Sequence, residues 1–285
     1  MNWVLASLLM FASSVALYTS IRKAQLMKIS IEVYSLFMFG VPALAYLFFI
    51  VAWGLPYRLP VRDLIEIFAA AVLFSYLGNF FSQKSILKAP NPGYSLMISK
   101  SYIVFTTIAA IFLFNASLTL KSSVAILMIL AFSSMIASPT EPKGKGKGKS
   151  WLAYSFGAFF CWGLLALALK HFLLAGIEIF VTLFYLTAVV SGIIFFEIKA
   201  KRMRIALEPK DLLIVLAIGG LSALFNAFMN LGYQTAPNIG YLNAVNASSI
   251  AFVTVLSSVF FKDHLSAKKV IGIVGSTIGL IVLLV

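Results

Sequence analysis

The sequence predicts an all-α integral membrane protein in which ten transmembrane helices form two inverted five-helix repeats. Three observations lead to this fold class: an apolar composition, ten long apolar stretches and an internal repeat. Of the 285 residues, 61% are hydrophobic and 11% are charged, and the mean hydropathy is +1.01. A soluble domain is about 45–50% apolar and about 25% charged. This composition therefore excludes a water-soluble enzyme, a disordered chain and a fibrous protein.

Ten apolar stretches follow one another along the chain, and each can cross a membrane as a helix, which takes about 20 residues. They cover residues 3–21, 31–53, 64–83, 93–114, 121–137, 151–169, 176–197, 211–233, 240–261 and 267–285. The runs are continuously apolar and do not alternate, so spanning strands are not expected. The first run is interpreted as a retained span and not a signal peptide, because the basic residues Arg22 and Lys23 follow it.

The positive charge of the chain is distributed unevenly among the predicted loops. Lys and Arg number 22 against 9 Asp and Glu, a formal net charge of +13. In a membrane protein such an excess sets the topology, so no nucleic-acid partner is expected. Seventeen of the basic residues lie in the odd-numbered loops and four in the others. The odd-numbered loops are therefore predicted to be cytoplasmic, with both termini outside, in a multi-pass protein of the plasma (inner) membrane.

Residues 138–150 divide the chain into two parts. The segment alternates Lys and Gly up to Lys149 and is expected to be a flexible basic linker on the cytoplasmic side. It could serve as a tether between the two parts or as a patch that meets lipid headgroups. On this interpretation residues 1–137 form the first five-helix repeat and residues 151–285 form the second.

The two parts share a sequence pattern at an offset of 147–148 residues. Ala89–Tyr94 (APNPGY) matches Ala236–Tyr241 (APNIGY). Other matches keep the same order: Arg62-Asp63-Leu64 with Lys210-Asp211-Leu212, Asn79 with Asn226, and Phe105 with Phe252. Because five spans is an odd number, the second copy would enter the membrane upside down. Inverted copies suit alternating access about a site near the midplane; the alternative is a duplication kept for stability.

The second half contains a series of features in a fixed order. They are Leu231–Pro237, a small-residue helix to Phe261, Asp263 before Leu265-Ser266, and Gly272-x-x-Gly275-x-x-x-Gly279. In this series the chain resembles the drug/metabolite transporter superfamily, in its ten-helix EamA-like branch. The first half departs from the pattern, because Ala116 stands at the place of the acid and its last span lacks the glycines. The resemblance implies transport of a metabolite such as an amino acid, sugar, nucleotide sugar or drug.

Two polar stripes occupy equivalent places in the repeats. Residues spaced by four share one helix face, and the members are Ser75, Asn79 and Gln83 in the third stretch and Ser222, Asn226 and Asn230 in the eighth. Such stripes are costly against lipid. They either line a central hydrated cavity, with Asn79, Gln83, Asn226 and Asn230 binding the solute, or they hydrogen-bond between helices.

The fourth and ninth stretches add Ser99, Asn243 and Asn246 to the predicted substrate-binding residues. Both stretches follow an Ala-Pro-Asn-x-Gly-Tyr turn, whose Pro and Gly fit a tight turn and a helix start. A helix start also favours anionic groups. Trp162 lies deeper in its span than an interface anchor would, and it either lines the same cavity or packs in the bundle.

Lys100 lies about two turns inside the fourth stretch. A Lys near a helix centre costs roughly 2.5–3.5 kcal/mol on insertion scales. It is either a cavity cation that meets a carboxylate or phosphate of the substrate, or a side chain that snorkels to the interface. Its equivalent in the second repeat is Ala247, so the charge is asymmetric, as a site for an asymmetric solute would be.

The nine acidic residues fall near predicted span ends or in loops. The four-helix members of the superfamily use a carboxylate in the first helix for proton coupling, and the first and sixth spans here have none, so proton antiport is not expected. The HExxH, CxxC, GxSxG and phosphate-loop motifs are missing from the sequence. No catalytic residue, metal or cofactor is therefore expected, and the chain is not expected to be an enzyme.

The sequence thus predicts a secondary transporter of a small metabolite, working as an exporter, exchanger or facilitator. Its site is expected between the third, fourth, eighth and ninth spans. The expected partners are a small-molecule substrate and the lipid bilayer, with the chain a monomer or a homodimer; Gly275 and Gly279 could pack within one chain or between two. The alternative is a lipid-handling protein or a subunit of a membrane complex, and a membrane enzyme is the third candidate.

Overall fold

The computed structural model describes residues 2–89, 92–137, 150–203, 205, 207–262 and 265–285, and its regular structure in those ranges is helical throughout. The helices are α1 (Trp3–Leu26), α2 (Ile31–Ala52), α3 (Val61–Ala69), the π-helical η1 (Ala70–Tyr76), α4 (Leu77–Lys88), α5 (Pro92–Lys100), α6 (Tyr102–Phe114), α7 (Leu120–Ala137), α8 (Ser150–Leu174), α9 (Ile179–Ala200), α10 (Pro209–Thr235), α11 (Ile239–Phe261) and α12 (Ala267–Leu284). The predicted linker up to residue 149 and the acid at position 263 lie outside the described residues.

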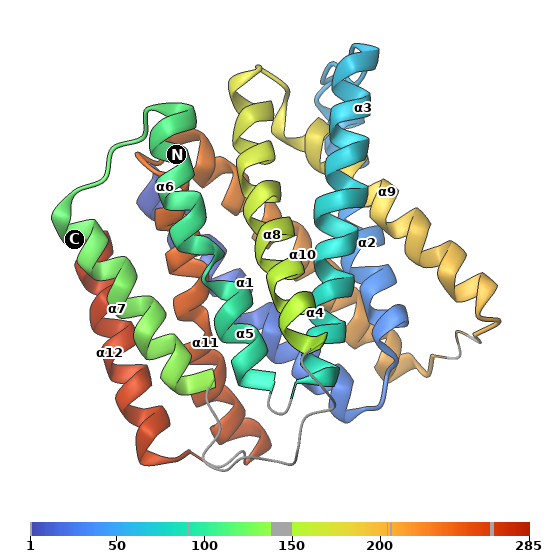
Figure 1. Cartoon of the computed structure of the whole chain (residues 1–285). Coiled ribbons are helices and arrows are strands. Elements are labelled where there is room, and N and C mark those ends of the chain that lie inside the picture. Colours follow the sequence, from blue (N-terminus) through green and yellow to red (C-terminus); the bar gives the residue numbers. More distant parts are fainter. Residues whose placement is uncertain (1, 90–91, 138–149, 204, 206, 263–264) are drawn as a thin grey trace.

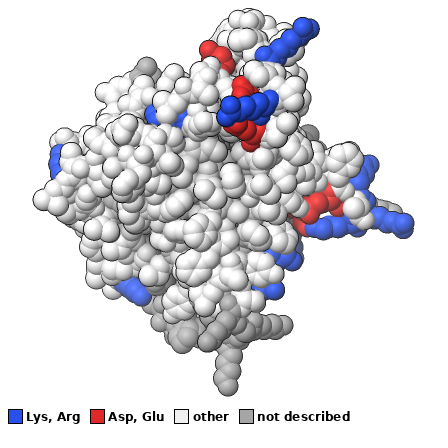
Figure 2. All heavy atoms as spheres, turned by 45° about the horizontal axis from the view of Figure 1, so that its top comes forward, with Lys and Arg blue, Asp and Glu red and all other residues white. Residues whose placement is uncertain are grey.

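Ten helical stretches among the described residues are long and apolar enough to cross a membrane, which confirms the predicted number. The third is Val61–Lys88, made of α3, η1 and α4, and the fourth is Tyr94–Phe114, made of α5 and α6. On the face drawn in Figure 2, charged side chains gather toward the edges and leave a broad uncharged area between them. The chain is therefore a multi-pass membrane protein.

Polar side chains fix where several of these helices begin. Asn2, Ser30, Asn238 and Ser266 each accept a backbone N–H of the first turn, at the starts of α1, α2, α11 and α12. The first N–H groups of a helix have no partner within it, and such caps satisfy one of them. The helix starts are thus local consequences of the sequence.

Helices of the first half pair mainly with helices of the second. The closest pairs are α1 with α10, α2 with α9, α4 with α8, and α7 with α12. When each helix is replaced by its equivalent in the other half, the pair α1–α10 becomes α8–α4, and the pairs α2–α9 and α7–α12 stay the same. The contacts therefore have the symmetry expected of two equivalent halves. Successive spans alternate in direction, so α1 begins at the upper edge of Figure 1 and α8 at the lower edge. This arrangement is what inverted copies need; the duplication itself stays a prediction.

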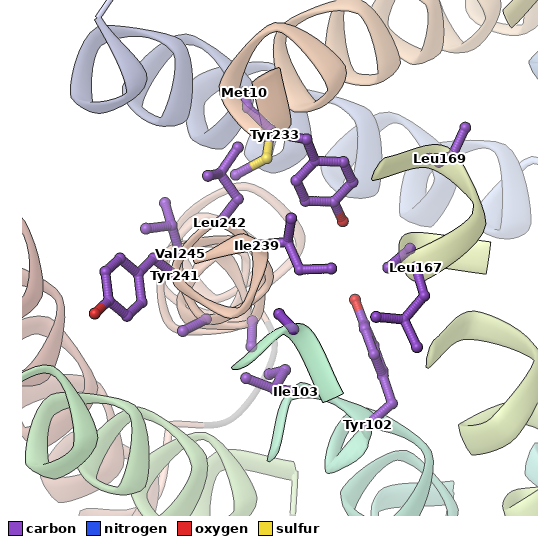
Figure 3. Close-up of a cluster of buried hydrophobic side chains, with 14 of the residues drawn as sticks. Met10, Tyr102, Ile103, Leu167, Leu169, Tyr233, Ile239, Tyr241, Leu242 and Val245 are labelled. Atoms are coloured by element: carbon purple, nitrogen blue, oxygen red, sulfur yellow. The ribbon is translucent and has the colours of Figure 1, made fainter. Parts of the chain in front are cut away.

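The largest apolar core surrounds the first half of α11. All residues from Ile239 to Ser249 are buried, so this helix has neighbours on every side. Figure 3 shows Ile239, Leu242 and Val245 of α11 among side chains from α1, α6, α8 and α10. A helix encased in this way is shielded from lipid, and its polar residues must find partners inside the protein.

The π-helical segment η1 accommodates one extra residue in the first half. Leu64 and Ser75 are eleven positions apart, whereas their equivalents Leu212 and Ser222 are ten apart. A π-helical turn widens a helix locally, so the extra residue is absorbed within the span and α4 continues in register. The corresponding part of α10 is α-helical without interruption.

The fourth span is broken next to Lys100. Helix α5 ends at Lys100 and α6 begins at Tyr102, and the Ser101 hydroxyl donates to the Ile98 carbonyl at 2.6 Å. Hydroxyl groups that bond back to the preceding turn bend helices. The equivalent position in the second half is Ser248, inside the unbroken helix α11. The sequence predicted a continuous span over 93–114, and the break is the main local departure from it.

The glycines of the last span pack inside the chain. A Cβ atom at Gly272 would lie 2.8 Å from the Phe132 carbonyl oxygen, one at Gly275 would meet the Phe132 ring, and one at Gly279 would lie 3.0 Å from Ile129. All of these neighbours belong to α7. Of the two interpretations left open by the sequence, packing within one chain is the one observed.

Gly219 and Gly220 are neighbours on α10 and provide a matched test of helix packing. A Cβ at Gly219 would lie 2.7 Å from the Phe37 carbonyl oxygen of α2, whereas one at Gly220 would meet nothing within 4 Å. Gly219→Ala is expected to destabilise the fold by about 1–3 kcal/mol through overpacking. The midpoint of thermal unfolding in detergent would measure this loss.

Gly220→Ala is the control for that experiment. Alanine favours a helix by about 1 kcal/mol over glycine, so this variant is expected to keep or raise the midpoint. Equal midpoints for the two variants would contradict the close α10–α2 contact.

Candidate functional site

Polar side chains meet around the buried part of α11 and form what we call the central cluster. Its members are Ser14, Tyr18, Lys100, Tyr102, Thr106, Trp162, Tyr233, Asn243, Asn246 and Ser249. The Ser14 hydroxyl of α1 lies 2.9 Å from Asn246 Oδ1 and 3.0 Å from Ser249 Oγ. The cluster thus joins α11 to the first span by hydrogen bonds in the interior of the bundle.

Asn243 connects α11 to two further helices. Its Nδ2 donates to Thr106 Oγ1 of α6 at 3.0 Å, and its Oδ1 accepts the hydroxyl of Tyr233 of α10. Figure 3 shows the hydroxyl groups of Tyr233 and Tyr102 pointing toward the same space beside α11. Asn243 and Asn246 are thus both buried, and each forms hydrogen bonds that join α11 to neighbouring helices.

Lys100 lies at the break in the fourth span, with aromatic rings around its ammonium group. Its Nζ is 5.2 Å from the ring centroid of Trp162 on α8 and 5.9 Å from that of Tyr18 on α1. Both distances are within the range of a cation–π interaction. Among the described residues no carboxylate pairs with this ammonium group and no acceptor takes a hydrogen bond from it. Lys100 therefore presents unused donors, three at most, from a partly buried position.

Trp162 is held deep in the bundle by a glycine. A Cβ at Gly78 of α4 would lie 2.9 Å from the Trp162 ring, so only a residue without a side chain lets α4 and this ring approach so closely. The Tyr102 ring packs edge-on against the same indole at 6.2 Å. The predicted site residues Lys100 and Trp162 are thus brought together, from α5 and α8.

The amide groups of the two predicted stripes bond mainly to their own helices. Asn79 Nδ2 donates to the Ser75 carbonyl at 2.8 Å, and the equivalent Asn226 Nδ2 donates to the Ser222 carbonyl at the same distance. Asn230 Nδ2 donates to the Asn226 carbonyl at 2.9 Å. At least one N–H of each amide is therefore occupied within its own helix, and the amide oxygens remain to accept a donor.

Ser99 is fully buried, and its hydroxyl lies 3.3 Å from the Leu96 carbonyl of its own helix. Like the α10 amides Asn226 and Asn230, it bonds within its own helix and forms no hydrogen bond with Lys100 or Trp162. The structure thus brings Lys100 next to Trp162 and joins Asn243 to the network of α11, but it does not gather all the predicted residues at one point.

Asn79 and Gln83 lie in a separate groove between α2, α4 and α9, which we call the α2–α4–α9 groove. The groove is partly open to solvent. It is lined by Ile31, Glu32, Ser35, Phe39, Tyr76, Asn79, Phe80, Gln83, Val190, Ile194 and Glu197. None of the other predicted site residues lines this groove, and its walls come from the second, third and seventh spans.

Two carboxylates in this groove were not among the predicted site residues. Glu197 Oε1 accepts the Tyr76 hydroxyl at 2.8 Å, and Glu32 Oε1 pairs with Lys201 Nζ at 3.1 Å. The sequence placed both acids only at span ends. The start of the second span and the end of the seventh lie on the same side of the membrane. This shared side was the signal from which a common site for the two acids could have been predicted.

Lys170 was also missed. Its Nζ donates to the Tyr233 carbonyl at 2.6 Å. That carbonyl has no helical donor, because the residue four positions on is Pro237, which lacks an N–H. Lys170 therefore ties the end of α8 to the end of α10. The Pro in the repeated turn and a Lys at the end of a span were the available signals.

The described residues contain no group of three or more His, Cys, Asp or Glu side chains that could hold a metal ion. The site is therefore made of hydroxyl, amide, aromatic and ammonium groups. Such groups can bind a polar solute by hydrogen bonds and charge, and they offer the solute both donors and acceptors.

Comparison with known proteins agrees with this architecture. A crystal structure of a protein superposes with a TM-score of 0.77 over 97% of this chain and 96% of that chain, at 16% sequence identity. At that identity the likeness concerns the fold alone. No curated protein matches the sequence significantly.

The second half of the chain provides the family assignment. Residues 149–285 match the model of the EamA-like transporter family, and this range covers α8 to α12 with the Pro237 turn, the encased helix α11 and the glycines of α12. Together with the ten apolar spans, this match identifies the chain as a member of the EamA-like transporter family.

Proposed function

We propose that the protein is a secondary transporter that moves a small metabolite by alternating access and binds it at the central cluster. The observation that carries the proposal is the position of Lys100. It lies at a helix break inside the bundle, its ammonium group faces two aromatic rings, and it has no carboxylate partner among the described residues. A partly buried charge without a partner carries a desolvation cost, so an anionic group of the solute would complete this site.

The two ends of the bundle differ, as alternating access requires. At the end where α8 and α10 finish and α11 begins, Lys170, Tyr233, Asn243 and Thr106 form a continuous chain of hydrogen bonds. Asn238 Nδ2 adds a bond to the Thr107 carbonyl at 3.1 Å. We call these six residues the closing network. At the opposite end, where α2 begins and α9 finishes, the α2–α4–α9 groove is open.

The charge pattern gives this asymmetry a direction. The groove lies on the side of the odd-numbered loops, and the excess of basic residues there supports a cytoplasmic position for these loops. We therefore propose that the structure represents the state open to the cytoplasm, in a protein of the plasma membrane with residues 1–137 and 151–285 as its two repeats. Rocking between these halves would break the closing network and expose the central cluster to the outside. Export, exchange and facilitated diffusion all fit this cycle.

A lipid-handling protein or a complex subunit remains the alternative. It would require polar side chains open to the bilayer, whereas Asn230, Asn243 and Asn246 are buried. In a thermal-shift panel, stabilisation by lipids alone would favour this alternative over metabolite transport.

Lys100→Ala is expected to weaken the binding of an anionic solute, selected from a metabolite panel, by about ten- to a hundredfold. A hydrogen bond to a charged group is worth about 1.5–3 kcal/mol, and 1.4 kcal/mol is tenfold in affinity. Uptake into proteoliposomes and ligand-induced thermal shift would both measure the loss. Lys100→Arg keeps the charge and is expected to retain part of the affinity.

Lys88→Ala is the matched control for Lys100→Ala. Lys88 also lies over an aromatic ring, 4.7 Å from the centroid of Tyr154, but its side chain is exposed at the end of α4. This variant is expected to transport normally. Unchanged transport in Lys100→Ala would eliminate the proposed role of the central cation.

Asn243→Ala is expected to open the closing network. The variant loses two hydrogen bonds of about 0.5–1.5 kcal/mol each, so the population of the state open at this end would rise about five- to a hundredfold. With Cys161 replaced by serine, the substitution Ile239→Cys places a reporter thiol at the closed end. Its rate of labelling by a hydrophilic maleimide would measure the change.

Two controls separate this shift between states from local unfolding. Thr254 of α11 bonds only to the Ile250 carbonyl of its own helix, and Thr254→Ala is expected to leave the labelling rate unchanged. A second reporter, Ser35→Cys, lies in the groove. Unfolding would raise labelling at both reporters, whereas the proposed shift raises it at position 239 and not at position 35.

A further inference from the structure

The α2–α4–α9 groove combines charge, hydrogen-bond acceptors and apolar walls in a way that the central cluster does not. It contains two carboxylates, and the cluster around α11 contains none among the described residues. The groove is also the place where two residues of the predicted stripes, Asn79 and Gln83, reach open space. The groove would therefore bind a different part of a ligand from the part that Lys100 would bind.

The charges of the groove leave one carboxylate without a cation. Glu32 pairs with Lys201 at 3.1 Å, which satisfies both charges. Glu197 accepts only the neutral hydroxyl of Tyr76, and no Lys, Arg or His of the described residues forms an ion pair with it. Among the described residues, no positive charge compensates the charge that Glu197 contributes to the groove.

The other polar groups of the groove include amide oxygens that can accept hydrogen bonds. One of the two N–H groups of the Asn79 amide is bonded to the Ser75 carbonyl, so its Oδ1 and one N–H are left for a ligand. Gln83 lies one turn further along the same helix and adds a second amide oxygen. An ammonium group offers up to three donors and no acceptor, and it matches one carboxylate and two amide oxygens.

The remaining walls of the groove are apolar. Phe39 and Ile194 are buried beside it, and Phe80 is partly exposed at its edge. Aromatic and aliphatic walls next to a few polar groups are typical of sites for small amphipathic molecules. A carboxylate or phosphate ligand would meet the charge of Glu197 and would be repelled.

We infer that the α2–α4–α9 groove binds the ammonium group of a small amphipathic amine, with Glu197 as its counter-charge and Asn79 and Gln83 as its hydrogen-bond acceptors. This inference extends the proposed function, since the groove opens on the side from which a solute would enter. Its test is binding at equilibrium and does not depend on transport.

The test uses the full-length protein in detergent and phenethylamine as the probe. Phenethyl alcohol and 3-phenylpropionate carry the same ring with a neutral and a negative group. Titration calorimetry is expected to detect binding of the amine and to show that the other two compounds bind at least tenfold more weakly. Glu197→Gln keeps the size of the side chain and is expected to weaken amine binding at least tenfold.

Glu66→Gln is the matched control. Glu66 belongs to α3 at the other end of the molecule, where it pairs with Arg62 at 2.8 Å, and its loss is expected to leave amine binding unchanged. Gln83→Leu provides a second variant if Glu197→Gln folds poorly, and it is expected to weaken amine binding severalfold.

Lys100→Ala is expected to bind the amine normally. A failure of the proposal for the central cluster can therefore be distinguished from a failure of the proposal for the groove.

Three outcomes would overturn the inference. They are absence of amine binding to the unmodified protein, equal binding of the amine and the alcohol, and unchanged amine binding in a folded Glu197→Gln variant.

Discussion

The hydrocarbon core of a membrane supplies no hydrogen-bond partners, and the rest of this structure depends on that constraint. Every backbone group inside the bilayer must be satisfied by the protein itself, so the spans are helices. The same constraint acts on side chains: the stripe amides of α4 and α10 donate to carbonyls four residues back. Where Pro237 deprives the Tyr233 carbonyl of its donor, Lys170 supplies one from another helix.

The two halves satisfy this constraint differently. In the second half α10 and α11 are unbroken, and α11 is buried on all sides over its first eleven residues. In the first half the equivalent spans contain the π-helical segment η1 and the break at Lys100. Irregular backbone at membrane depth is tolerated where it is buried in protein or lines a cavity. The break at Lys100 thus lies beside the aromatic side chains of the central cluster.

The polar groups of the protein fall into two chemically distinct places. The central cluster has an ammonium group, hydroxyls and amides, and it lacks carboxylates among the described residues. The α2–α4–α9 groove has carboxylates and amide oxygens. The proposed sites thus take complementary charges, an anionic group at the centre and a cationic group at the groove, and a solute or a pair of solutes with both kinds of group would use both.

The sequence by itself determined the fold class, the ten spans and the family, because apolar runs of membrane length and a repeated Pro-Gly turn are properties of neighbouring residues. It also singled out Lys100, since a charge inside an apolar run is costly wherever the helix packs. Only the tertiary structure decided that Trp162 and Tyr18 cover that charge, that Asn79 and Gln83 face a different space from Asn243, and that Glu197 borders it. These facts depend on which helices pack together, on the extra residue that η1 absorbs and on the break at Lys100. Contacts between spans far apart in the chain leave no local pattern in the sequence.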